Sequence, residues 1–169
     1  PTGLKVTGGA GDNSNNLIYN YYSHLEQFKV ASDIKVLAPG AGVGIGKFAG
    51  ASLLAQFPMY DTGENHILIY GLGGLVLSAG YTVSVGDSLS ISVQRRFDTA
   101  SATLINYTQH YTVTVGYKYL IYPPVFGPTM PNNGQYGIYF AGGANRVFDF
   151  HLSSTENKHA LCAFAGNSI

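Results

Sequence analysis

The chain has 169 residues, enough for one domain with a substantial hydrophobic core. Only 11% of its residues are charged, and nine basic side chains balance nine acidic ones, so neither nucleic acid nor an anionic membrane surface is an expected partner. An apolar fraction of 46% excludes a disordered chain. No run of about 18 apolar residues is present, so no membrane insertion is expected.

Apolar residues recur at every second position along most of the chain. This period predicts β-strands, and no segment has the 3.6-residue period of an amphipathic helix. The predicted strands, in chain order, cover about 16–22, 28–36, 43–48, 52–57, 66–70, 75–79, 89–94, 102–107, 111–119, 135–140 and 146–152. Short turn signals rich in Gly, Asn and Asp separate them. The pattern predicts an all-β fold, a β-sandwich of two antiparallel sheets.

Glycines occupy every second position of the run 40–46, which invites comparison with nucleotide-binding loops. The Rossmann fingerprint has glycines at its first, third and sixth positions, and a phosphate-binding loop has Ser or Thr after its lysine, where this chain has Phe48. We therefore interpret the run as a strand with one bare face. A ring or a neighbouring backbone can lie flat on such a face.

Side chains that could hold a metal ion or perform catalysis are dispersed. The five histidines lack the spacing of a zinc site, and spacing selects no Ser-His-Asp triad, so we predict no metal site and no cofactor. One alternative stays open, because the oxygen-rich run 11–16 could hold a structural calcium ion or simply form Asx turns. The sequence at 106–108 is a formal N-glycosylation sequon. The single cysteine, Cys162, excludes an intrachain disulfide and is interpreted as a small buried hydrophobe.

The longest irregular segment covers about 122–134 and contains four prolines. Because proline has no N–H to donate to a sheet ladder, this segment is predicted to be a loop at an edge or an end of the sandwich, where binding surfaces often lie. If the domain binds a glycan, the predicted binding residues are Tyr122 and Tyr136, as exposed rings that stack on a sugar. The alternative is that both tyrosines only pack the loop against the sandwich.

Two parts of the chain resemble a known arrangement. Residues 133–143, followed by 147–150, resemble the closing strands of concanavalin-like sandwich domains that precede bacterial hydrolases of the SGNH/GDSL type. Residues 86–95 are similar to the middle of such modules. The terminal run 164–169 resembles the first sequence block of the hydrolase itself, although Asn167 stands where the family has Asp.

This resemblance implies a domain organisation. A lectin-like, jelly-roll or concanavalin-like domain would cover 1–155, and 156–169 would be the first strand and turn of a hydrolase. Ser168 would then be the catalytic nucleophile, but only in a longer parent protein. The family's other catalytic residues lie downstream of this block, so the chain alone is not expected to be an esterase.

Three functions remain open on this basis. The first is a non-catalytic carbohydrate-binding or structural module of a secreted or cell-surface esterase, with a glycan and the downstream hydrolase domain as partners. The second is a structural, self-associating surface protein or part of a phage-like assembly, which would form homo-oligomers. The third is a fragment of an active carbohydrate esterase.

Overall fold

The computed structural model describes residues 3–8, 15–21, 25–47, 53–71, 74–118 and 134–155. Every regular element in these ranges is a β-strand, as the two-residue period predicts. The strands are β1 (Leu4–Thr7), β2 (Asn15–Tyr21), β3 (Gln27–Ala38), β4 (Gly40–Lys47), β5 (Leu53–Met59), β6 (Asn65–Gly71), β7 (Gly74–Tyr81), β8 (Ser88–Arg96), β9 (Thr99–Asn106), β10 (Tyr111–Lys118), β11 (Gly134–Phe140) and β12 (Ala144–Ser153). The described part of the chain contains no helix with the length and apolar character that a membrane crossing requires.

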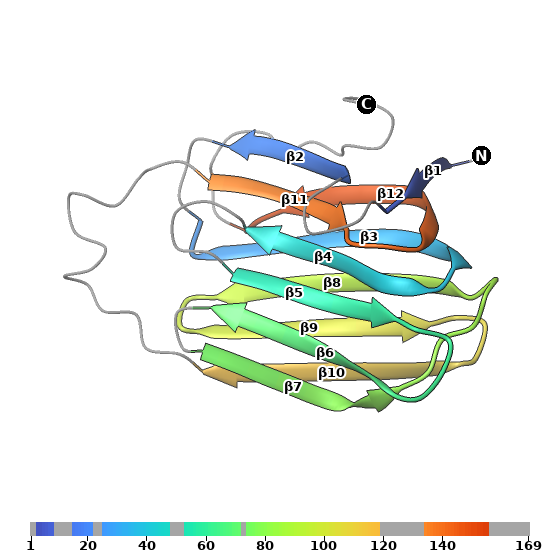
Figure 1. Cartoon of the computed structure of the whole chain (residues 1–169). Coiled ribbons are helices and arrows are strands. Elements are labelled where there is room, and N and C mark those ends of the chain that lie inside the picture. Colours follow the sequence, from blue (N-terminus) through green and yellow to red (C-terminus); the bar gives the residue numbers. More distant parts are fainter. Residues whose placement is uncertain are drawn as a thin grey trace.

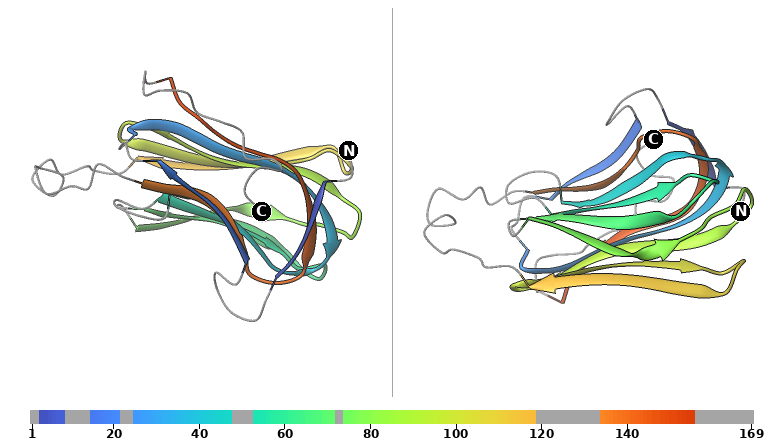
Figure 2. Two further views of the ribbon diagram at one scale, coloured as in Figure 1. Left: turned by 90° about the horizontal axis from the view of Figure 1, so that it is seen from above. Right: turned by 60° about the horizontal axis from the view of Figure 1, so that its bottom comes forward.

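The strands form two antiparallel sheets that lie face to face (Figure 1, Figure 2). Sheet A has the strand order β1-β12-β3-β8-β9-β10, and sheet B has the order β2-β11-β4-β5-β6-β7. Strands that follow one another from β4 to β7 and from β8 to β10 are therefore neighbours in space. The two closing strands, β11 and β12, enter opposite sheets. The predicted two-sheet antiparallel β-sandwich is confirmed.

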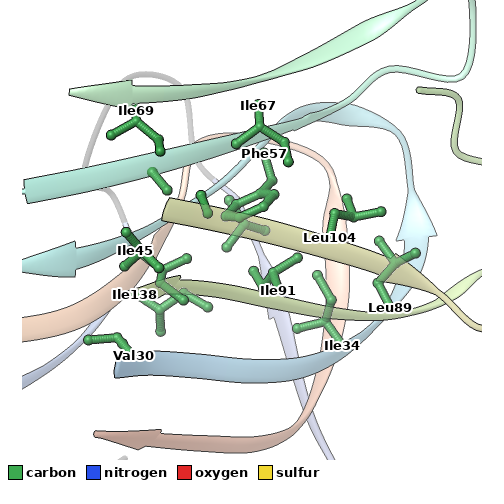
Figure 3. Packing of buried hydrophobic residues seen from close by; sticks show 14 of the residues in the cluster. Val30, Ile34, Ile45, Phe57, Ile67, Ile69, Leu89, Ile91, Leu104 and Ile138 are labelled. Carbon is green, nitrogen blue, oxygen red and sulfur yellow. The ribbon is translucent and has the colours of Figure 1, made fainter. Parts of the chain in front are cut away.

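Side chains that point between the sheets form one hydrophobic core (Figure 3). Ile91 and Leu104 of sheet A pack in the same cluster as Phe57 and Ile69 of sheet B, and all four are 0% exposed. Strand β8 alternates buried and half-buried positions along almost its whole length, as predicted. Fully burying a side chain of this size contributes roughly 1.5–3 kcal/mol, so this core makes the sheets a firm scaffold for the surface.

The bare face predicted for the glycine-rich run is present on β4. A Cβ built at Gly44 would lie 2.0 Å from Cε1 of Tyr139, so the tyrosine ring occupies the space that a side chain would need. A Cβ at Gly46 would lie 2.1 Å from the carbonyl oxygen of Leu53 on the neighbouring strand, and Gly46 has a φ of +142°. A tyrosine ring and a neighbouring backbone occupy the space that side chains at these two glycines would need. This confirms the structural interpretation of the run.

A buried carboxylate joins two turns of the sandwich. Asp87 Oδ2 accepts hydrogen bonds from the backbone N–H of Ser84 at 2.9 Å, from Asn106 Nδ2 at 2.9 Å and from Gln109 Nε2 at 2.6 Å. Asn106 is 0% exposed, and its Oδ1 accepts a further bond from the N–H of Gln109 at 2.9 Å. The asparagine of the sequon therefore has a structural role, and its amide nitrogen is inaccessible in the folded domain.

The opposite end of the sandwich carries a tighter connection. Phe97 and Asp98 join β8 to β9, and Arg96 pairs with Thr99 across this two-residue turn. Figure 1 shows the turn at the left, beside the start of β3 and the end of β10. We call this the hairpin end. It brings together the termini of strands that are far apart in the sequence.

Candidate functional site

Two adjoining hollows indent the surface of sheet A at the hairpin end, with volumes of about 200 Å³ and 280 Å³. Both are open to solvent. They share Gln94 and Arg96, so we treat them as one feature, the hairpin groove. It is lined by Gln27, Phe28, Lys29, Gln94, Arg95, Arg96, Thr99, Ala100, Ser101, Gly116, Ser153, Ser154 and Thr155.

Five of these positions form one row that crosses the strands. The register pairs Ser153 of β12 with Lys29 of β3, and Lys29 with Gln94 of β8. It then pairs Gln94 with Ser101 of β9, and Ser101 with Gly116 of β10. Because neighbouring strands lie about 4.8 Å apart, the row is roughly 19 Å long. Four polar side chains and one bare position thus follow one another along the groove.

An exposed aromatic residue lies in the turn that follows β8, three positions along the chain from Gln94 of this row. Phe97 has a φ of 53°, which is unusual for a bulky residue, and the residue is 54% exposed. Two hydrogen bonds hold the backbone in this conformation: Phe97 N–H donates to the carbonyl oxygen of Glu26 at 2.7 Å, and Arg95 Nε donates to the carbonyl oxygen of Phe97 at 2.9 Å. A strained backbone maintained at a surface aromatic residue marks a candidate for function.

The interior behind the groove is cationic. Lys47 of β4 is 0% exposed and Arg95 of β8 is 3% exposed. Burial, and secondarily the nearby charge of Arg95, lower the pKa of Lys47 from 10.5 to about 8. The positive charge of Lys47 therefore destabilises the folded state at neutral pH.

We expect this effect to appear as a pH-dependent difference between the wild type and Lys47→Met. Below pH 8 the amine is charged in both the folded and unfolded chains, and its burial disfavours the fold. Between pH 8 and 10.5 the unfolded chain binds more protons, so this penalty fades as pH rises. The advantage of the methionine variant in unfolding free energy should shrink by on the order of 2–3 kcal/mol across that interval.

Urea unfolding of both proteins from pH 7 to 10.5 measures this difference. Burial also raises the pKa of Tyr81, whose hydroxyl donates to the carbonyl oxygen of Pro58 at 2.8 Å. That group lowers the stability of both proteins at high pH, so it cancels in the comparison. A difference that is constant over the whole range would contradict the role assigned to Lys47.

The residues predicted from the sequence do not form this site. Tyr136 is 0% exposed, and its ring packs edge-to-face on Phe28 with centroids 5.1 Å apart. The expectation of an exposed ring at Tyr136 is therefore wrong, because the ring lies between the sheets. Tyr122 and Ser168 lie outside the described residues, as do most of the 122–134 loop, Cys162 and all but the end of the 11–16 run.

Sequence reasoning did not single out the residues of the hairpin groove. Alternation in β8 and β3 predicts that the side chains of Gln94 and Lys29 face outward, and this is the signal that the sequence offers. Two-residue hairpin turns with a positive φ usually contain Asn-Gly or Asp-Gly. The turn here is Phe-Asp, so the sequence does not indicate the positive φ at Phe97. No local sequence pattern predicts the order of the strands in the sheet, and it is this order that pairs Ser153 with Lys29.

Acidic and histidine side chains form pairs rather than larger clusters in the described ranges. His151 Nδ1 lies 3.2 Å from Asp149 Oδ2, and both side chains are about two-fifths exposed. His66 Nε2 lies 3.9 Å from Glu64 Oε2. Among the described residues, no three His, Cys, Asp or Glu side chains gather as a metal site would require.

Known proteins resemble this chain in structure but not in sequence. No family model matches it, and no curated protein matches it. The enzymatically active domain of tailspike protein 2 from bacteriophage CBA120 superposes with a TM-score of 0.60 at 16% identity, over 92% of this chain and 28% of that one. The GH43 protein BlXynB from Bacillus licheniformis superposes with a TM-score of 0.60 at 10% identity, over 90% of this chain and 33% of that one.

A third solved structure, xylan beta-1,4-xylosidase from Bacillus halodurans C-125, superposes with a TM-score of 0.58 at 8% identity, over 90% of this chain and 33% of that one. This chain thus spans a third or less of each of these proteins. At such low identities the likeness concerns the fold alone. The chain has the β-sandwich architecture that these longer proteins contain as one part.

Proposed function

We propose that this chain is a non-catalytic carbohydrate-binding β-sandwich, and that the hairpin groove is its binding site. The observation that carries the proposal is the row of four polar side chains and one bare position across five strands, together with the exposed Phe97 in the turn that follows β8. Gln94, Ser101 and Ser153 offer amide and hydroxyl groups, which donate to and accept from sugar hydroxyls. The ring of Phe97 offers an apolar face on which a sugar can stack.

The strands supply the rigidity that such a site needs. Gln94 and Ser101 project from central strands of sheet A, whose opposite faces are held by the core. A backbone that the sheet already holds loses little conformational freedom when a ligand binds. A row roughly 19 Å long suits an extended oligosaccharide better than a single sugar.

We further propose that the domain is one module of a larger secreted or cell-surface protein. Two observations support this: the structural matches span only part of longer proteins, and two of those are described as a tailspike's enzymatically active domain and a xylosidase. The resemblance of the terminal run to SGNH hydrolases favours an esterase as the parent. Ser168 would be its nucleophile, and the present domain would hold the esterase on a glycan.

Phe97→Gly separates function from stability in this proposal. Glycine adopts a φ of 53° without strain, so the release of about 1–2 kcal/mol should offset the greater entropy of the unfolded chain. We expect the melting temperature of Phe97→Gly to stay unchanged or rise. Glycan binding should fall at least tenfold, because the stacking surface is gone.

The test is a glycan array followed by titration calorimetry on the strongest ligand, with thermal unfolding in parallel. Tyr107→Ala is the matched control, since Tyr107 is also 54% exposed but lies at the opposite end of β9. Equal binding by the wild type and Phe97→Gly would reject the hairpin groove as the site. A chain that binds no glycan on the array would reject the proposed function.

A further inference from the structure

We propose that the hairpin groove selects acidic glycans, those that carry carboxylate or sulfate groups. This inference rests on the proposed function and names the ligand class of the same site. It comes from the charge of the residues that line the groove.

The groove gathers positive charge in a chain that is neutral overall. Three of the nine basic side chains line it, namely Lys29, Arg95 and Arg96, and no Asp or Glu does. The acids adjacent in sequence, Glu26 and Asp98, line neither hollow, and each has an interaction of its own. An anionic ligand is the natural complement of such a lining.

Two of these cations are exposed and placed as a pair. Lys29 is in register with Gln94, and Gln27 is in register with Arg96, so Lys29 and Arg96 are diagonal neighbours on adjacent strands. Diagonal positions lie about 7–8 Å apart, which leaves room for one anionic group between the two side chains. Within the part of the chain that the structure describes, neither Lys29 nor Arg96 forms an ion pair.

The chemistry of the pair favours a carboxylate or sulfate over a hydroxyl. The guanidinium of Arg96 can donate two parallel hydrogen bonds to such a group, and the ammonium of Lys29 can donate from the other side. Gln94, which is opposite Lys29, and Ser101, which is opposite Gln94, remain available for sugar hydroxyls. Arg95, which is 3% exposed, adds positive potential to the lining.

The test compares charged polysaccharides with uncharged counterparts of the same backbone. Polygalacturonate is paired with its methyl ester, and dextran sulfate with dextran, so the two arms distinguish carboxylate from sulfate. By calorimetry in low salt, we expect at least tenfold tighter binding to one charged polymer than to its partner, and weaker binding as salt rises.

Arg96→Gln is the decisive variant, and Lys35→Gln is its control. Lys35 lies on the same face of β3, six residues from Lys29, but lines neither hollow. Arg96→Gln should lose at least tenfold in affinity for the charged polymer at an unchanged melting temperature, and Lys35→Gln should lose little.

The possible results distinguish a failure of the acidic-glycan proposal from a failure of the proposed glycan binding. Equal affinity for a charged polymer and its uncharged partner would overturn the acidic class and leave glycan binding standing. Equal losses in Arg96→Gln and Lys35→Gln would mean unspecific attraction and would also overturn it. Failure to bind either polyanion, with neutral glycans bound on the array, would overturn the acidic class alone. Failure to bind any glycan would overturn both proposals.

Discussion

Gly46→Ala is expected to lower the unfolding free energy by about 4 kcal/mol or more, a fall in melting temperature of roughly 8–16 °C for a domain of this size. The added methyl group would lie 2.1 Å from the carbonyl oxygen of Leu53, and that oxygen belongs to the backbone of the neighbouring strand. Neither atom can move without breaking the ladder between β4 and β5. The φ of +142° adds conformational strain to the collision.

Gly63→Ala is the control for this prediction. Gly63 also has a positive φ, of 76°, but no atom lies within 4 Å of the Cβ position, so only the conformational penalty of about 1–2 kcal/mol applies. Thermal unfolding followed by circular dichroism compares the two variants. Equal losses of unfolding free energy in the two variants would show that the contact between Gly46 and the Leu53 carbonyl oxygen does not contribute to the effect.

Asp87→Ala should have the next largest effect, a loss of about 3–4 kcal/mol in unfolding free energy. The substitution removes the common acceptor of three donors, two of them side-chain amides at the buried junction of the turns. Asn106, itself 0% exposed, would keep its Nδ2 out of water and retain only a longer contact of 3.3 Å to the hydroxyl of Tyr111.

Asp87→Asn and Asp33→Ala make this prediction specific. Asparagine keeps one acceptor oxygen and should lose less than alanine, while Asp33 is an exposed residue of β3 whose replacement should change stability by less than about 0.5 kcal/mol. Chemical unfolding in urea measures all three variants. A loss below about 1 kcal/mol for Asp87→Ala would show that water replaces the carboxylate at this junction.

Most of the fold is predictable because alternation of buried and exposed positions is a local property. Strand β8 shows it clearly from Ser88 to Gln94, where the inward positions are apolar and the outward ones are Ser and Gln. Strand β1 is not predicted because four residues are too few for a recognisable alternation, and all four are half-buried or exposed. The Gly44 and Gly46 positions were interpretable because a bare strand face has few physical explanations.

The candidate site is less predictable because its residues meet only after both sheets have formed. Ser153 and Lys29 share a row across β12 and β3 that no spacing in the sequence reveals. Tyr136 shows the converse difficulty. A tyrosine beside a loop suits either a binding surface or a core position, and only its contact with Phe28 distinguishes them.

The placement of the two closing strands has a consequence for how the protein is made. β11 pairs between β2 and β4, and β12 pairs between β1 and β3. Neither sheet can therefore complete its strand pairing before these last described strands are synthesised. Ser32 Oγ donates to the carbonyl oxygen of Asp149, 117 positions further along the chain. Until those residues leave the ribosome, β3 and β4 each have an unpaired edge, which favours aggregation. The yield of soluble protein should therefore depend on how promptly β11 and β12 arrive, whatever the stability of the finished core.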